Sequence, residues 1–262
     1  MTDVLLVDRN EGVATLTLNR PDSMNSLSVE LKEALLDATR DVSADPAVRA
    51  VVLTGTGRGF CVGQDLREHV SLLEAGDPAP LSTVSKHYNP LVLGIARMPK
   101  PVIAAVNGMA AGAGAGLAFA CDFRFASRTA GFLLAFANVG LTLDSGVSWT
   151  LPRLVGQARA SALAILAEPI SADSAFEMGL VNGVVDAEKV LPTAQELAAR
   201  LALGPTAAYA AIKESIAFGA SADLESALAK EDELQTAMGR TDDHRNATMA
   251  FVNKQKPTFT GH

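Results

Sequence analysis

The stretch that decides the fold is KPVIAAVNGMAAGAGAGLAFACDFRFAS, residues 100–127. Its first part, residues 100–108, is a short apolar run that ends in glycine, as expected of a buried strand. A glycine-rich turn then leads into a second apolar run, which we expect to be a buried helix. Residues 101–121 carry no charge and have the length of a membrane span. Because Asn107-Gly108 interrupts the run and its glycines weaken a helix, strand, turn and helix is the better interpretation.

Outward from this stretch, the chain alternates strands and helices. VRAVVLTGTG (residues 48–57) is another apolar run that ends in glycine, and VLLVDRNEGVATLTLNRP (residues 4–21) has the alternation and the central turn of a β-hairpin. A helix is expected after Ser28, because it is a good cap and an apolar stripe follows at Leu31 and Leu35. The alternation predicts an α/β core with parallel pairing.

After Pro152 the pattern becomes helical. A short helix is expected to begin at Ser171, and longer ones at residues 187–203, 206–218, 223–238 and 242–253. We therefore divide the chain into a core at residues 1–200, which would hold the functional site, and a helical region at residues 201–262, which would mediate assembly.

Composition excludes several classes of function. The net charge of −7 argues against a nucleic-acid-binding surface. The two cysteines, Cys61 and Cys121, lie far apart in apolar surroundings, so we expect reduced thiols in a cytoplasmic protein. No cysteine–histidine cluster predicts a metal site. The acidic residues of MTDVLLVDRNEG are not typical of a signal peptide, and we expect no association with a membrane.

Two glycine-bearing turns each follow a predicted strand. They are GRGFCVGQDL (residues 57–66) and NGMAAGAGAG (residues 107–116), and each is expected to lead into the N-terminus of a helix. Backbone N–H groups are free there, and two that converge would form an oxyanion hole. Neither turn is a dinucleotide-binding or P-loop motif. Taken in isolation, such a turn is more often a tight structural connection.

Asp144 is the only charged residue among the 24 residues between Arg128 and Arg153. A carboxylate in apolar surroundings is costly unless it takes up a proton, which makes it a candidate acid–base catalyst. The alternative is a turn or helix-cap residue, since aspartate favours both positions.

Four segments together resemble the crotonase, or enoyl-CoA hydratase/isomerase, superfamily. They are LTLNRPDSMNSLS (residues 16–28), VVLTGTGRGFCVGQDL (residues 51–66), residues 100–127 and ISADSAFEMGLVNGVV (residues 170–185). The resemblance covers essentially the whole chain. It implies an α/β fold, a spiral of β-β-α units with a C-terminal helical trimerisation region. It also implies an acyl-CoA thioester substrate, a homotrimer or dimer of trimers, and no cofactor beyond the coenzyme A of the substrate.

The resemblance also implies the site. The backbone N–H groups of Gln64 and Ala113 would bind the thioester oxygen. The residues expected along the substrate and its coenzyme A are Met24, Val62, Gly63, Asp65, Leu66, Gly112 and Phe136. Lys254 and Lys256 would either contact coenzyme A phosphates across a subunit interface or form a solvated tail.

The departures from the family indicate which reaction to expect. Hydratases of this superfamily carry two catalytic glutamates, where this chain has Gly116 and Phe136. Asp144 falls where single-acid members place their carboxylate, so we expect it to shuttle one proton, within an apolar wall of Phe132, Phe136 and Leu143 that raises its pKa.

FLLAFANVGLTLDSGVSWTLPRLVGQARA (residues 132–160), HYNPLV (residues 87–92) and FTGH (residues 259–262) are similar to the phenylacetate-pathway ring isomerases. These enzymes convert 2-(1,2-epoxy-1,2-dihydrophenyl)acetyl-CoA to oxepin-CoA and 3-enoyl-CoA to 2-enoyl-CoA. Val147 replaces a usual glycine, and we expect it to narrow the pocket.

Three alternatives remain open. One is an enoyl-CoA hydratase of low activity that uses Asp144 alone. Another is an aromatic acyl-CoA dehalogenase, with Asp144 as nucleophile and His87 as the assisting base. The third is a catalytically silent acyl-CoA binder. We expect Asp122 to be structural, Asp65 to cap a helix and Trp149 to pack beside the Asp144 loop.

Overall fold

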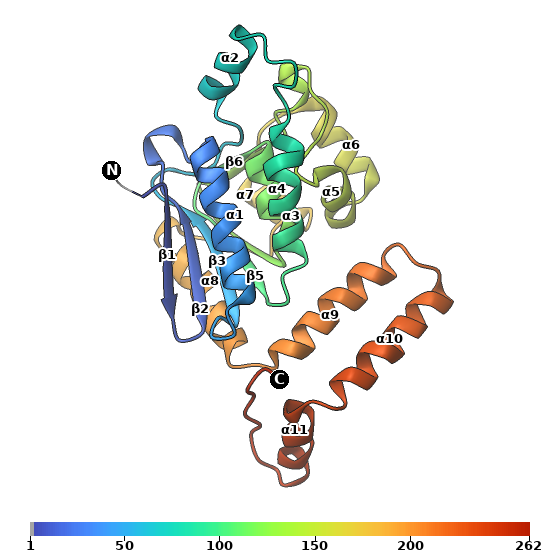
Figure 1. Ribbon diagram of the computed structural model, residues 1–262. Coiled ribbons are helices and arrows are strands. Elements are labelled where there is room, and N and C mark those ends of the chain that lie inside the picture. Colours follow the sequence, from blue (N-terminus) through green and yellow to red (C-terminus); the bar gives the residue numbers. More distant parts are fainter. Residues whose placement is uncertain (1–2) are drawn as a thin grey trace.

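The computed structural model describes residues 3–262, and this part of the chain contains two β-sheets surrounded by helices (Figure 1). The larger sheet has the order β1-β2-β3-β5-β7-β10, and the smaller sheet has the order β4-β6-β8-β9. The strands are β1 (Leu5–Asn10), β2 (Val13–Leu18), β3 (Ala50–Gly55), β4 (Gly59–Cys61), β5 (Val102–Val106), β6 (Met109–Ala111), β7 (Phe123–Ser127), β8 (Gly131–Leu133), β9 (Ile170–Ser171) and β10 (Gly183–Val185).

The two sheets grow together as a spiral of β-β-α units. After β3, β5 and β7 in the larger sheet, the chain crosses to β4, β6 and β8 in the smaller one. Each repeat adds one neighbouring strand to both sheets, with parallel pairing between repeats. The fold predicted from the resemblance is therefore confirmed, and the glycine turns of successive repeats lie next to each other.

The helices are α1 (Val29–Ala44), α2 (Leu66–Glu74), α3 (Asn89–Ala96), α4 (Ala113–Ala120), α5 (Val147–Val155), α6 (Gln157–Leu166), α7 (Ala172–Glu177), α8 (Val190–Ala202), α9 (Thr206–Gly219), α10 (Leu224–Met238) and α11 (Asp242–Val252). The four C-terminal helices agree closely with the ranges predicted for them, whereas α5 begins before Pro152, from which the helical pattern was expected to start. The short turns are η1 (Pro21–Ser23), the π-helical η2 (Val84–Tyr88), η3 (Ala137–Val139) and η4 (Ala187–Lys189). Ser28 and Ser171 cap α1 and α7 through their side chains, as expected.

The central strands are buried on both faces, which explains their uninterrupted apolar sequences. In β3, Ala50 and Val52 belong to the cluster packed under α8, whereas Val51 and Leu53 belong to the larger core that includes α1. Every residue of α4 is buried, and the run at residues 101–121 is strand β5, strand β6 and helix α4 rather than one long helix. Within the described residues, no helix combines the length and apolar character needed to cross a membrane.

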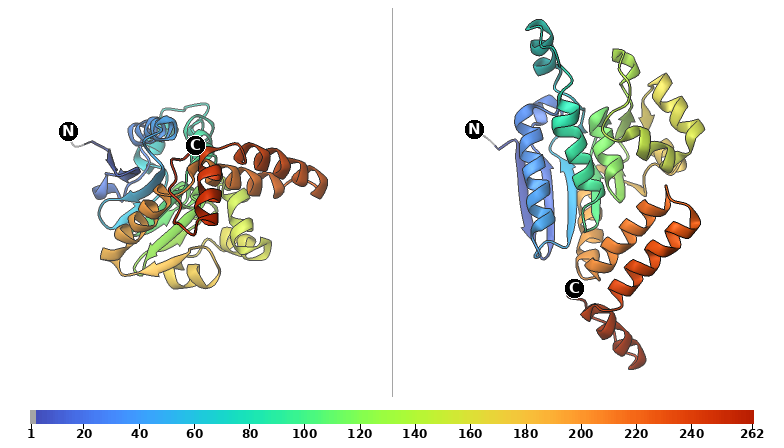
Figure 2. Two further views of the ribbon diagram at one scale, coloured as in Figure 1. Left: turned by 90° about the horizontal axis from the view of Figure 1, so that it is seen from below. Right: turned by 45° about the vertical axis from the view of Figure 1, so that its right-hand side comes forward.

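The C-terminal helices project from the core. α9 and α10 run side by side and α11 lies beyond them (Figures 1 and 2). The C-terminal tail folds back past α11, whose Asp243 carboxylate accepts hydrogen bonds from the N–H groups of Thr260 and Gly261. Arg49 also donates to the carbonyl oxygen of Phe259. α8 packs against the larger sheet, so the helices that leave the core begin with α9.

Candidate active site

A cavity of about 1400 Å³ lies where the two glycine turns, η1 and the loop before α5 meet. Most of the predicted site residues line it: Val62, Gly63, Gln64, Asp65, Leu66, Gly112, Ala113, Phe136 and Asp144. The cavity is large enough for an extended ligand. Segments that are far apart in the sequence therefore form one site.

The two glycine turns are in direct contact inside this cavity. Gly63 has a φ of +85°, and a Cβ built on it would lie 3.3 Å from the backbone nitrogen of Ala113. Ala113 is the first residue of α4, and Gln64 directly follows Gly63. In the described chain, the N–H groups of Gln64 and Ala113 have no hydrogen-bond partner. Two free donors on adjacent turns, one at a helix N-terminus, favour a negatively charged oxygen.

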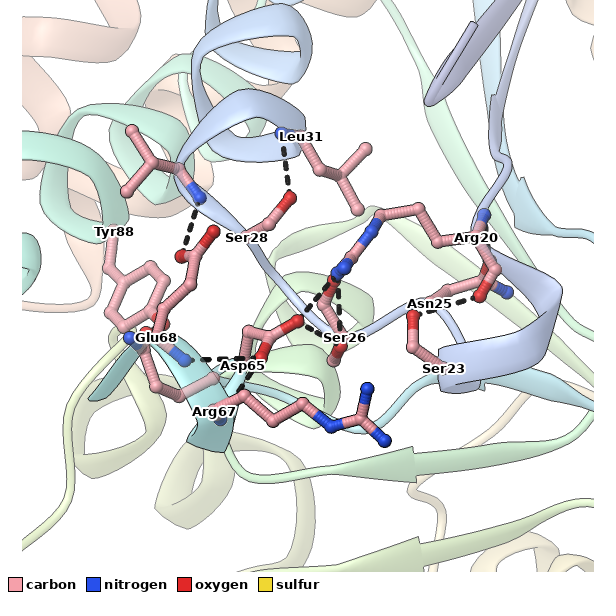
Figure 3. A network of polar contacts seen from close by, with 12 residues as sticks. Arg20, Ser23, Asn25, Ser26, Ser28, Leu31, Asp65, Arg67, Glu68 and Tyr88 are labelled. Atoms are coloured by element: carbon pink, nitrogen blue, oxygen red, sulfur yellow. Dashed lines mark hydrogen bonds and ion pairs between the residues drawn. The ribbon is translucent and has the colours of Figure 1, made fainter. Parts of the chain in front are cut away.

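A polar network holds the first turn in place (Figure 3). The Asp65 carboxylate accepts hydrogen bonds from Arg20 Nη1 and Ser26 Oγ, both at 2.9 Å, and from the backbone N–H groups of Arg67 and Glu68. Burial alone would raise the pKa of Asp65, but these hydrogen bonds outweigh it and hold that pKa below the usual range. Asp65 thus caps α2, as expected, and fixes the segment that carries the Gln64 N–H.

Asp144 lies in the loop before α5 and lines the same cavity. Its Oδ1 accepts a hydrogen bond of 2.8 Å from Ser145 Oγ. Ser145 (φ +50°) and Gly146 (φ +72°) are both left-handed, a tight bend that presents the half-buried carboxylate to the cavity. Burial raises the pKa of Asp144 above its ordinary value, while the Ser145 hydrogen bond opposes this.

Two other carboxylates line the cavity; one forms an ion pair and the other is exposed to solvent. Asp65 is held in its ion pair with Arg20, and Asp22 lies exposed in η1. Asp144 is therefore the lining carboxylate, within residues 3–262, that combines partial burial with the lack of an ion-pair partner.

Two expectations about the cavity wall need correction. Phe136 lines the cavity as predicted, but its apolar companions are Val139 and Leu141 rather than Phe132 and Leu143. Phe132 is fully buried in β8, where its ring stacks on Phe119 at a centroid distance of 5.8 Å. Leu143 packs against the core.

Val147 does not narrow the pocket either. It is fully buried in α5, and its Cγ2 lies 3.3 Å from where a Cβ on Gly116 would be. Met24 also lies outside the lining; it is half-buried beside Gly59, and its carbonyl oxygen accepts a hydrogen bond from the N–H of Val62.

Other residues singled out in the sequence lie away from the cavity. Asp122 forms a 2.7 Å ion pair with Lys213, which supports the structural role expected for it. His87 does not line the cavity; its Nδ1 lies 3.0 Å from Thr83 Oγ1. Trp149 is half exposed, with Arg153 stacked on its ring. Among residues 3–262, no cluster of three acidic, cysteine or histidine side chains could bind a metal ion.

Sequence reasoning missed Tyr88. It is buried, lines the cavity, and its hydroxyl donates a hydrogen bond to the side-chain oxygen of Gln64. The only sequence signal for Tyr88 was its place in HYNPLV. Its contact with Gln64 is made from the π-helical turn η2, which local patterns did not predict.

Comparisons with known proteins agree on one family. The profile described as enoyl-CoA hydratase/isomerase matches residues 8–262. The chain is 44% identical to the 1,2-epoxyphenylacetyl-CoA isomerase of Escherichia coli (strain K12), with all of both chains covered. It is 43% identical to a probable enoyl-CoA hydratase of Rhodobacter capsulatus, over 96% of each chain. The crystal structure of enoyl-CoA hydratase from Bacillus anthracis superposes with a TM-score of 0.92 at 33% identity, covering 99% of this chain and 100% of the other.

Proposed function

The chain belongs to the enoyl-CoA hydratase/isomerase family, and we propose that within it this protein is an isomerase of acyl-CoA thioesters that uses one carboxylate. The observation that carries the proposal is Asp144, the partly buried lining carboxylate without an ion-pair partner among residues 3–262, on the cavity that also contains the unpaired N–H groups of Gln64 and Ala113. Where hydratases of the family carry glutamates, this chain has Gly116 and Phe136.

The proposed reaction moves one proton. Ionised Asp144 removes a proton from C2 of a 3-enoyl-CoA, and the electrons of that bond form a dienolate. The N–H groups of Gln64 and Ala113 stabilise the negative charge on the thioester oxygen, where one such donor is worth about 3–4 kcal/mol. Protonated Asp144 then returns the proton to C4, so that the double bond lies between C2 and C3 and no atom is gained or lost.

The same shuttle is proposed for 2-(1,2-epoxy-1,2-dihydrophenyl)acetyl-CoA. The carbon beside the thioester loses a proton to Asp144, and the ring carbon–carbon bond that closes the epoxide breaks to give a seven-membered oxepin. The proton returns to a carbon of the enlarged ring, and the oxygen keeps both of its carbon–oxygen bonds. The relative from Escherichia coli, an isomerase of 1,2-epoxyphenylacetyl-CoA, supports this choice of substrate.

The environment of Asp144 fits a base that must also return its proton. Burial raises its pKa toward the operating pH, which makes both proton removal and proton return efficient. The apolar side chains of Phe136, Val139 and Leu141 in the same lining would exclude water from the dienolate. We also propose that the chain assembles as a homotrimer or a dimer of trimers.

The test compares the wild type with Asp144→Asn and with Asp37→Asn, an exposed aspartate of α1, as the matched control. Isomerisation of a 3-enoyl-CoA and hydration of a 2-enoyl-CoA are followed separately. We expect the wild type and Asp37→Asn to isomerise and barely hydrate, and Asp144→Asn to lose isomerisation by at least 10²-fold.

Each contrary result points to a named alternative. Hydration that matches or exceeds isomerisation would make the protein a hydratase. Turnover of a 4-chlorobenzoyl-CoA with a covalent aryl adduct on Asp144 would make it a dehalogenase. Binding of these esters without turnover would make it a silent acyl-CoA binder.

A further inference from the structure

Tyr88 lines the cavity that also contains the proposed oxyanion donors and Asp144. It lies at the end of η2, just before α3, and is almost fully buried. Its hydroxyl donates to the side-chain oxygen of Gln64, the residue whose backbone N–H is one proposed oxyanion donor. Gln64, Tyr88 and Asp144 all line the same cavity. Tyr88 therefore belongs to the wall of the cavity that is proposed to hold the acyl group.

The surroundings of Tyr88 keep its hydroxyl protonated. Burial and the negative charge of Asp144 both raise the pKa of Tyr88 far above its ordinary value. The buried ammonium of Lys32 lies 5.6 Å from the centroid of the Tyr88 ring and donates a 2.9 Å hydrogen bond to Thr83 Oγ1. The attraction between this cation and the ring helps to hold the ring in place. The hydroxyl is thus a fixed hydrogen-bond donor and a very weak acid.

We infer that Tyr88 is a specificity-determining residue, whose hydroxyl leaves the Gln64 side chain to donate a hydrogen bond to an oxygen on the ring of an arylacetyl-CoA substrate. The inference rests on the proposed function and names its substrate class. A linear 3-enoyl-CoA has no oxygen beyond the thioester, so it leaves the hydroxyl on Gln64. Only the ring substrate gains the new hydrogen bond.

The weak acidity suits the ring reaction. A strong acid would protonate the epoxide oxygen, break a carbon–oxygen bond and restore the aromatic ring as a hydroxyphenylacetyl ester. A donor that keeps its proton orients the oxygen while both carbon–oxygen bonds remain, and only the ring carbon–carbon bond breaks. Tyr88 thereby favours ring enlargement over re-aromatisation, and the proton that moves is the one carried by Asp144.

The test uses Tyr88→Phe, which removes one oxygen atom, and Tyr209→Phe as the matched control. Tyr209 is the chain's other tyrosine and lies in α9, outside the lining. We expect Tyr88→Phe to lower kcat/KM for 2-(1,2-epoxy-1,2-dihydrophenyl)acetyl-CoA about tenfold, as loss of one hydrogen bond would. Its kcat/KM for a 3-enoyl-CoA should fall by a clearly smaller factor, and more hydroxyphenylacetyl ester should form. Tyr209→Phe should match the wild type with both substrates.

A binding measurement on the wild type keeps the test independent of the variant's folding. The wild type should bind 2-hydroxyphenylacetyl-CoA several-fold more tightly than phenylacetyl-CoA, and Tyr88→Phe should lose that difference. Equal affinities in the wild type would overturn the inference. So would an equal loss with both substrates in Tyr88→Phe, because the hydroxyl would then act only through Gln64. If the wild type does not isomerise the 3-enoyl ester at all, the proposed function fails instead.

Discussion

Gly116 lies directly against the backbone of Ser145: a Cβ built on Gly116 would be 2.6 Å from the Cβ of Ser145 and 2.8 Å from its carbonyl oxygen. Real side chains do not tolerate such contacts, and both atoms belong to the tight bend that presents Asp144. The bend therefore occupies the space in which a hydratase would carry its first glutamate. Position 116 and Asp144 are coupled through this contact, and this arrangement leaves room for one carboxylate rather than two.

Gly116→Glu should accordingly fail to create a hydratase. The new side chain would displace Ser145 and with it Asp144, so we expect isomerisation to fall at least tenfold and stability to fall by about 1–3 kcal/mol. Gly219→Glu is the control, because nothing lies within 4 Å of a Cβ at that position. Steady-state kinetics with both ester types and urea unfolding measure the two effects. A gain of hydration in Gly116→Glu with isomerisation intact would show that the bend accommodates both groups.

Gly63 directly precedes Gln64 and lies against Ala113, the residues of the two proposed oxyanion donors. Gly63→Ala should therefore abolish most of the isomerase activity. The new Cβ would lie 2.9 Å from the carbonyl oxygen of Ala111 and 3.3 Å from the nitrogen of Ala113, which pushes the turns apart. We expect kcat to fall about 10²–10³-fold, as on loss of an oxyanion donor. Gly76→Ala is the matched control: it shares the left-handed backbone (φ +66°) but has no atom nearby. Equal kinetic losses in both variants would mean that backbone strain, not the donors, is responsible.

Local patterns predict the helices and strands well, because caps, turns and apolar periodicity are local properties of the chain. The helix expected at residues 206–218 is α9, Thr206–Gly219, and the hairpin expected within residues 4–21 is formed by β1 and β2. The pairing of the two glycine turns did not follow from such patterns. It came from the resemblance to the family, and the spiral topology explains it, since successive repeats occupy neighbouring strands.

Local sequence patterns could not predict which side chains point into the cavity and which point into the core. Phe132 and Leu143 were expected to wall the cavity, but strand β8 directs Phe132 into the core, and Val139 and Leu141 take that place. Tyr88 was missed for a similar reason, because its hydroxyl meets Gln64 only through the π-helical turn. Such contacts join segments distant in sequence, and no spacing along the chain reveals them.

The pH dependence of isomerisation should report Asp144. Because burial raises its pKa, the acid limb of the kcat/KM profile should lie above the ordinary pKa of an aspartate, near 4. Activity requires the ionised form and is therefore lost as the pH falls through the raised pKa. A profile with 3-enoyl-CoA that stays flat down to the ordinary aspartate pKa would contradict this assignment.

The ionised carboxylate of Asp144 should lower the free energy of unfolding at neutral pH. A folded-state pKa raised above the unfolded value means that folding favours the protonated form, so stability falls as the pH rises through that interval. Asp144→Asn removes the charge but keeps an acceptor for Ser145, and we expect it to unfold at a higher temperature than the wild type at pH 7. Thermal unfolding at pH 7 and at pH 3 checks this, since the two proteins should converge in acid. A less stable Asp144→Asn at pH 7 would mean that the carboxylate supports the bend.

Asp65 should matter for stability and catalysis together. Asp65→Ala uncaps α2 and leaves Arg20 without its partner, which should cost about 2–4 kcal/mol and lower kcat as the Gln64 segment loosens. The folded-state pKa of Asp65 is lowered, so its stabilising effect is complete above the unfolded pKa and is lost as the pH falls through the lowered value. The difference from the wild type should therefore shrink in acid. Asp223→Ala removes a cap without an ion pair and should destabilise less, with kcat unchanged.

The C-terminal helices carry large apolar side chains that a lone chain would leave in water. Phe251 is 82% exposed and Leu224 76% exposed, on α11 and α10. Further exposed apolar side chains on α9, α10 and α11 are Ile212, Ile216, Leu228, Met249 and Val252. Because such extensive apolar exposure is typical of interaction surfaces, and the proposed assembly is a trimer or a dimer of trimers, we expect the wild type to sediment at three or six times the chain mass. Phe251→Glu should shift it toward monomer, whereas Val7→Glu on the edge strand β1 should not. A wild type that sediments as a monomer at micromolar concentration would contradict the proposed trimer, and the apolar helices would then need another partner.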